Sequence, residues 1–346
     1  MSRRLERKRP AKLKMSDIAR IAGVDKSTVS RALSDSDQVS RSTRARIRQI
    51  ARDHNYQLDV AARNFRHSQS KTVKVLVPIG AAGVPMFTDP FVMDLLASIA
   101  DTLSDRDYNM LLSKVILSSA EMLRDSFDAR HADGAIVIGQ RRFHDELNDM
   151  AESKIPLVVW GAQFPDQQYC SVGGDNVGGS RSAVRHLIKR GCKRIVFLGD
   201  VAMAEPKLRC EGYRIELERA GLAYDETLVV STQYDRLSAY TVMSRCIEDG
   251  LKFDAVFGTS DVVAMSAIAA LHDHDIDVPG DVPVVGYDDI TLASYFSPAL
   301  TTVRQHIPRA GRILVDKVLR MASGESADSE IIPTELIVRR SCGATS

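Results

Sequence analysis

The chain has 346 residues, of which 44% are hydrophobic and 26% are charged, so it is long enough for two to three domains with a sizeable core. No apolar run approaches the roughly 18 residues of a membrane span. The five cysteines are widely spaced and form no C-x-x-C pair, which excludes a disulfide framework or a zinc site of the usual spacing.

The formal net charge of +1 hides an asymmetry along the chain. Residues 1–71 contain 18 Lys and Arg against 7 Asp and Glu, whereas the remainder contains 28 against 38. A basic head on an acidic body indicates a polyanionic partner at the head, and a solvated basic tail is the alternative. No apolar segment follows the N-terminal arginines, so we expect no signal peptide and a cytoplasmic protein with reduced thiols.

Residues 16–34 predict two short helices joined by a glycine turn. Ser16 is a good N-cap, and one face of the first helix carries Ile18, Ile21 and Ala22. Gly23 ends this helix, because the residue after a helix often adopts the left-handed conformation. The second helix begins near Lys26, with Val29, Ala32 and Leu33 facing inward. Its outward face is polar and basic, which is typical of a helix-turn-helix.

Two further helical stretches follow in the head. Residues 42–54 predict a third helix whose inward side chains are Ile47, Ile50 and Ala51. The stretch Val60–Arg66 is basic and has one large apolar residue, Phe65.

From Val73 onward, short apolar runs alternate with amphipathic helical patterns. The apolar runs lie at residues 73–79, 109–115, 134–139, 156–161, 194–199, 255–260 and 283–289. The helical patterns lie at residues 91–105, 143–153, 176–190, 209–221, 238–249 and 261–275. This alternation predicts parallel sheets with helices on both faces, and the number of elements favours two similar subdomains.

The head resembles that of the lac-repressor family of transcription factors. The resemblance lies in the strings VDKSTVSRAL, HNY and AARNFR, in this order and spacing. It implies that the second helix enters the major groove, with Lys26, Ser27 and Arg31 at base-reading positions and Thr28 and Ser30 at phosphate or packing positions. Outward polar residues that only keep a helix soluble are the alternative.

The resemblance also implies a hinge helix that inserts an apolar side chain into the minor groove. Phe65 stands where the family has a leucine, and Leu58 stands where a proline is common. Phenylalanine is itself a minor-groove wedge, and Arg63 and Arg66 suit the flanking phosphates. An anchor that packs onto the body is the alternative for Phe65.

The body resembles the effector-binding body of the same family in the strings DPF, GGDN, RCEGY, TSD, VPGDVPVVGYDDI and SPALTTVRQ. This body is similar to periplasmic sugar-binding proteins, so the resemblance implies a multidomain α and α/β protein with a small all-α head and a two-lobed α/β body with parallel sheets. The expected divisions are a basic tail (1–14), the helix-turn-helix domain (15–58), hinge and linker (59–72), and a body (73–342). Within the body we expect an N-lobe at about 73–173 and 303–333 and a C-lobe at about 174–302 and 334–342.

The resemblance further implies an effector site between the lobes. The expected effector-binding residues are Asp89, Phe91, Trp160, Arg209, Asp261 and Gln305. An intramolecular salt bridge is the alternative for Arg209 and Asp261, and a core position is the alternative for Trp160. An Asp, Arg and aromatic set without an anion nest favours a neutral sugar, with a purine or nucleoside as the next ligand class.

The function implied is a repressor of carbohydrate-utilisation genes that a small sugar releases from a pseudo-palindromic, double-stranded DNA operator. A homodimer is expected, with a tetramer left open, and co-repression by the ligand is left open as well. No catalytic residue, cofactor, metal or membrane partner is expected, since no Ser or Cys has a supporting His. Asp288 and Asp289 follow one another along a strand end and need not converge as an acid/base pair. A sugar-binding protein without a DNA function is the remaining alternative.

Overall fold

The computed structural model describes residues 13–33, 37–54, 56, 70–79, 88–116, 132–140 and 143–343. The chain divides into two compact units, a head within Met1–Ser70 and a body within Lys71–Ser346. Each unit has a hydrophobic core of its own.

The described residues of the head form three helices. These are α1 (Met15–Ala22), α2 (Lys26–Leu33) and α3 (Arg41–Asp53). Ile18, Val29 and Ile47 contribute one fully buried side chain from each helix to the core. Gly23 ends α1 with a φ of 64°, the left-handed conformation that glycine adopts without a steric penalty. The predicted helix-turn-helix is therefore confirmed.

Two details of α1 differ from the prediction. The helix begins at Met15, so Ser16 lies inside it and is not the N-cap. The carboxylate of Asp17 accepts a hydrogen bond of 2.8 Å from the backbone N–H of Lys14, which fixes the earlier start. Ile21 is exposed, and Ala19 is buried in its place, because the core-facing stripe of α1 runs through Ile18, Ala19 and Ala22.

The described residues of the body form two six-stranded sheets, which define its two lobes. The N-lobe sheet contains, in spatial order, β11 (Glu330–Ile332), β5 (Cys170–Gly174), β4 (Leu157–Trp160), β3 (Gly134–Ile138), β1 (Thr72–Ile79) and β2 (Asn109–Ile116). All of its strand pairs are parallel. Its helices are α5 (Pro90–Ser104), α7 (His144–Glu152) and α13 (Ile307–Ala322).

Both faces of the N-lobe sheet are covered. Val73, Val75 and Val77 of β1 belong to the same core cluster as residues of α5 and α13. Leu76 of the same strand belongs to the cluster that contains Leu147 of α7. Because successive side chains of a strand point to opposite faces, a strand buried on both faces is apolar at nearly every position.

The C-lobe sheet contains β12 (Glu335–Ile337), β10 (Thr301–Arg304), β9 (Val284–Asp288), β8 (Ala255–Gly258), β6 (Ile195–Leu198) and β7 (Val229–Val230). Only β12 runs antiparallel to its neighbour among the described strand pairs. The helices α8 (Asn176–Lys189) and α9 (Ala204–Arg219) pack together, as do α10 (Arg236–Glu248) and α11 (Asp261–Asp273). Short elements complete the lobe, namely η2 (Glu226–Leu228), α12 (Thr291–Tyr295) and η3 (Arg340–Cys342).

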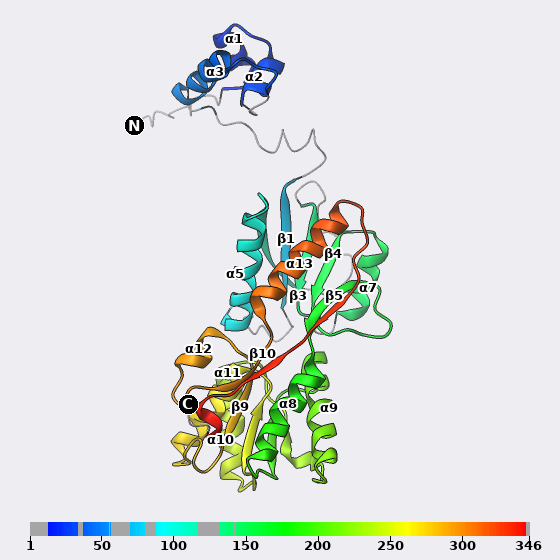
Figure 1. Cartoon of the computed structure of the whole chain (residues 1–346), viewed down its shortest axis with the longest axis vertical. Coiled ribbons are helices and arrows are strands. Elements are labelled where there is room, and N and C mark those ends of the chain that lie inside the picture. Colours follow the sequence, from blue (N-terminus) through cyan, green and yellow to red (C-terminus); the bar gives the residue numbers. More distant parts are fainter. Residues whose placement is uncertain are drawn as a thin grey trace, which may run out of the picture. The chain divides into compact units, whose positions relative to one another are not determined.

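The chain passes between the lobes three times. It leaves the N-lobe sheet after β5, returns after β10, and leaves again after β11 (Figure 1). We call residues 174–176, 304–307 and 332–335 the crossovers. Hydrogen bonds join two of them, since Asp175 donates its N–H to the carbonyl of Ile332 over 2.9 Å and Thr334 donates its hydroxyl to the carbonyl of Asp175 over 3.2 Å.

The predicted fold class is confirmed. The helix expected at 209–221 begins earlier, at Ala204. Sequence patterns did not indicate β5, β7, β10, β11, β12, α12 or α13. In the described part of the chain, no helix is long and apolar enough to cross a membrane.

Candidate functional site

The outward face of α2 is the candidate DNA-reading surface of the head. Lys26, Ser27 and Arg31 are exposed, whereas Val29 and Ala32 of the same helix are buried in the head core. Thr28 and Ser30 are half-buried, so they are less accessible than the three exposed residues. The surface therefore carries two cations and a hydroxyl on one exposed helix face.

The turn before α2 is fixed by α3. The guanidinium of Arg46 donates a hydrogen bond of 2.7 Å to the carbonyl of Ala22, the last residue of α1. This bond satisfies a carbonyl that the helix end leaves without an intrahelical partner. The hinge residues Arg63, Phe65 and Arg66, which the sequence assigns to DNA binding, lie outside the described residues.

In the body, Arg209 of α9 is the centre of a buried polar cluster in the C-lobe. Its Nε donates to Oδ1 of Asn176 over 2.8 Å, and its Nη1 donates to the carbonyl of Thr259. The guanidinium carbon lies 3.7 Å from the centroid of the Tyr287 ring, a cation–π arrangement. Only 4% of Arg209 is exposed. The planar fork is thus held in one orientation before any ligand arrives.

Asp288, at the end of β9, is the anionic member of this cluster. Its Oδ1 lies 4.0 Å from Nη1 of Arg209 and accepts a hydrogen bond of 2.7 Å from Nε2 of Gln305. Burial raises the pKa of Asp288 to about 7, against the opposing effect of Arg209, and the negative charge of Asp89 raises it further. The sequence prediction did not include Asp288 among the candidate site residues, although its place at the end of a buried strand could have indicated it.

Asp261 lies beside this cluster, but its carboxylate is fully buried in the C-lobe and bonded to internal partners. It has no exposed surface; Oδ1 accepts from the hydroxyl of Thr302 and Oδ2 accepts from the N–H of Ile290 over 2.9 Å. Burial and the neighbouring Asp288 raise its pKa well above the ordinary value. That Asp261 binds ligand hydroxyls therefore stays a prediction. Such binding requires the ligand to replace Thr302 or Ile290 as a hydrogen-bond donor to Asp261.

The N-lobe contributes the aromatic candidates. Phe91 and Trp160 have ring centroids 5.6 Å apart, and both belong to the large core cluster of the body. Asp89 caps α5 by accepting the N–H of Phe91 over 2.9 Å. Of the six predicted effector residues, the structure therefore joins Phe91 with Trp160 in one lobe, and it brings Arg209, Gln305 and the unpredicted Asp288 together on the other side.

The geometry of Asp288 gives a testable pH dependence of stability. Its pKa in the folded protein, about 7, exceeds the value of about 3.9 expected in the unfolded chain. Between these values the folded state holds a proton that the unfolded state lacks, so this group disfavours folding increasingly as the pH rises through 7. We expect Asp288→Asn to raise the melting temperature relative to wild type more at pH 8 than at pH 5.5. Calorimetry showing an equal difference at both pH values would contradict it.

Comparisons with known proteins agree with this architecture. Residues 14–59 match the family model described as bacterial regulatory proteins, lacI family, and residues 184–342 match a periplasmic binding protein-like domain. The transcriptional regulator CelR of Thermobifida fusca is 32% identical over 344 residues, which span 97% of this chain and 100% of that protein. The chain belongs to the lacI family of bacterial regulatory proteins. It is a DNA-binding transcriptional regulator.

Solved structures show the same relation. A complex of CelR with cellobiose is 30% identical, with a TM-score of 0.71, and the match covers 96% of this chain and 100% of that one. The lac repressor dimer bound to operator and an anti-inducer has a TM-score of 0.82 at 22% identity, covering 96% and 99%, which shows a shared fold. Within the described residues, no group of three or more His, Cys, Asp or Glu side chains is placed to hold a metal ion.

Proposed function

We propose that this regulator is a cytoplasmic, homodimeric repressor of carbohydrate-utilisation genes, released from a pseudo-palindromic operator by a small sugar. Cellobiose is the first candidate, because the CelR structure that resembles the whole chain is a cellobiose complex. The proposal assigns no catalytic residue, cofactor or metal.

The observation that carries the proposal is the separation of Arg209 and Asp288. At 4.0 Å the guanidinium and the carboxylate attract one another but are too far apart for a hydrogen bond. A sugar hydroxyl can accept from the first and donate to the second, so it completes both groups at once. Phe91 and Trp160, in the other lobe, are aromatic side chains whose faces suit a sugar ring.

A homodimer is supported by apolar side chains that the body leaves exposed. Met93 lies on α5, Leu111 and Leu112 lie on the edge strand β2, and Leu292 and Tyr295 lie on α12. The helix α5 contacts both β2 and the start of α12, so these side chains lie on neighbouring elements, and neighbouring exposed apolar side chains can mark a surface that binds a partner. Two copies would place two α2 helices on two half-sites of one operator.

The proposed function is tested by titrating cellobiose into the complex of the full-length protein with an operator selected from random DNA. Fluorescence anisotropy is expected to show release, and adenosine is expected to have no effect. Release by adenosine but not by cellobiose would move the effector to the nucleoside class. Tighter binding in cellobiose would establish co-repression.

Arg31→Ala is expected to weaken operator binding by about 1–3 kcal/mol per half-site and to relax the preference at one base pair. The reason is that an exposed guanidinium on α2 can bond O6 and N7 of one guanine. Arg20→Ala is the matched control, since it removes the same charge from α1, where the side chain is 79% exposed. Equal losses on selected and random DNA would make Arg31 a phosphate contact.

A further inference from the structure

The four residues at the end of β9, Asp288–Thr291, contact both lobes, and we call them the relay segment. Asp288 and Asp289 have φ values of 123° and 55°, conformations that cost free energy for residues other than glycine. They allow two successive carboxylates to enter two different polar networks. Asp288 contacts Arg209 and Gln305, whereas Asp289 contacts two arginines.

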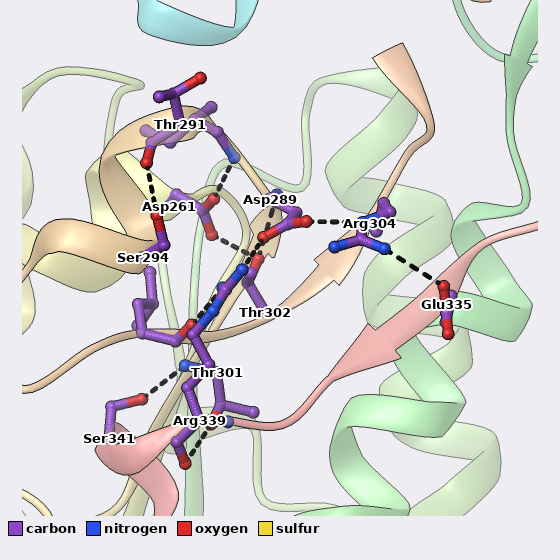
Figure 2. A network of polar contacts seen from close by, with 12 residues as sticks. Asp261, Asp289, Thr291, Ser294, Thr301, Thr302, Arg304, Glu335, Arg339 and Ser341 are labelled. Carbon is purple, nitrogen blue, oxygen red and sulfur yellow. Dashed lines mark hydrogen bonds and ion pairs between the residues drawn. The ribbon is translucent and has the colours of Figure 1, made fainter. Parts of the chain in front are cut away.

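Asp289 is linked through Arg304 to two of the three crossovers. One oxygen accepts from Nε of Arg304 and the other from Nη2 of Arg339, each over 2.6 Å (Figure 2). Nη1 of Arg304 also lies 3.5 Å from Oε2 of Glu335. Because Arg304 and Glu335 belong to different crossovers, Asp289 reaches one crossover directly and the next through the same arginine.

The other end of the relay segment reaches the N-lobe. The N–H of Ile290 is bonded to Asp261, which fixes the segment to the start of α11. The N–H and hydroxyl of Thr291 both donate to Oδ2 of Asp94 on α5, over long distances of 3.4 Å. A pocket of about 710 Å³ lies between this segment, α5 and the first turn of α13, and its lining includes Asp94, Asp289, Thr291 and Arg304. The pocket leaves room for the lobes to change their angle at this place.

We propose that the relay segment transmits effector binding at Asp288 to the crossovers, with Asp289 as a positioning residue that acts through Arg304. The inference rests on the proposed function, since it takes the Asp288 cluster as the effector site. A ligand hydroxyl that bonds Asp288 adds a second donor to the carboxylate that Gln305 already bonds, and Arg304, the neighbour of Gln305, is held by Asp289. The two adjacent carboxylates therefore link ligand contact and lobe angle through one stretch of backbone.

The test compares Arg304→Met with Arg185→Met in the full-length protein. Arg185 is a close match for Arg304: each side chain is 39% exposed, and each Nε lies 2.6 Å from a buried carboxylate. After each substitution the carboxylate still has a second arginine as its partner. Glu216 pairs with Arg181, and Asp289 pairs with Arg339. Arg185 joins α8 to α9 within the C-lobe, and among the described residues its side-chain hydrogen bonds go to Glu216, which lies outside the crossovers.

The readout is the ratio of operator Kd with and without saturating cellobiose, together with the Kd of cellobiose. Wild type and Arg185→Met are expected to share a ratio of about 5–150, whereas Arg304→Met falls to within about threefold of one. The Kd of cellobiose for the DNA-free protein should change by less than about threefold, because no ligand contact is removed. By reciprocity, the change then appears in the Kd of cellobiose for the operator-bound protein. Arg304→Lys is expected to restore part of the ratio, since an ammonium replaces one of the two contacts.

A wild-type ratio in Arg304→Met, or equal losses in both methionine variants, would overturn the relay. Hydrogen exchange, measured without DNA or sugar, distinguishes failure of the relay from failure of the proposed function. Arg304→Met should exchange faster than Arg185→Met at residues 304–307 and 332–335, whatever the effector is. If cellobiose does not change operator binding by the wild type while this difference in exchange is seen, cellobiose is not the effector, and the link from Asp289 through Arg304 to the crossovers is retained. Equal exchange would remove the relay.

Discussion

Raising the salt concentration from 50 to 200 mM is expected to weaken operator binding by about three to five decades. Residues 1–71 carry 18 Lys and Arg against 7 Asp and Glu, and Lys26 and Arg31 lie on the exposed face of α2. A dimer that neutralises about 6–10 phosphates releases their condensed counterions, and added salt opposes this release. Anisotropy titrations at several salt concentrations give the slope of log Kd against log salt.

The control for this prediction is the sugar. Cellobiose carries no charge, so its Kd for the same protein should change little over the same salt range. Lys26→Ala is expected to lower the salt slope by about one for each phosphate contact that it removes. Operator binding that hardly changed between 50 and 200 mM salt would contradict an electrostatic footprint on the head.

Arg209→Met is expected to abolish the response to sugar, with cellobiose affinity falling by at least about 100-fold. A hydrogen bond to a charged group contributes about 1.5–3 kcal/mol, and the fork can give two of them to neighbouring hydroxyls. The substitution also removes the cation that faces Asp288, so the pKa of Asp288 rises further and its carboxyl is protonated at neutral pH, which makes it a weaker acceptor of hydrogen bonds from sugar hydroxyls. Calorimetry with cellobiose and anisotropy with operator measure the two functions separately.

Operator affinity of Arg209→Met should stay within about threefold of wild type, because head and body are separate compact units. Arg209→Lys is the informative companion, since it keeps the charge but loses the planar fork that bonds Asn176 and the Thr259 carbonyl. We expect it to bind cellobiose more weakly than wild type and more tightly than Arg209→Met. Unimpaired cellobiose binding in the methionine variant would place the effector elsewhere.

The sequence by itself determined the elements whose signals are local. A glycine after an apolar i, i+4 pair is enough to end α1, and Val29 with Ala32 is enough to orient α2. Strands buried on both faces are read from apolar runs such as those of β1 and β8, because neither face can be polar. These patterns predicted the fold class and, together with the family resemblance, the candidate DNA-reading surface on α2.

Local signals were too weak for the short elements around the crossovers. The exception is the 16-residue helix α13, whose buried side chains Ile307, Ala310, Leu314, Val315 and Val318 follow a helical period that could have predicted it. Strands of two or three residues such as β7 and β12 show no period. Such strands form because the sheet supplies their hydrogen-bond partners, not because their own residues prefer the extended state.

Only the tertiary structure decided which polar side chains meet. Asp261 and Asp288 both follow C-lobe strands, yet Thr302 and Ile290 enclose the first while the second faces Arg209. The partners of Asp289 and Thr291, Arg339 and Asp94, lie 50 and 197 positions away in the chain. A hydrogen bond between such distant residues leaves no periodic trace in sequence, because the path of the backbone through both lobes, and not spacing, brings the two atoms together.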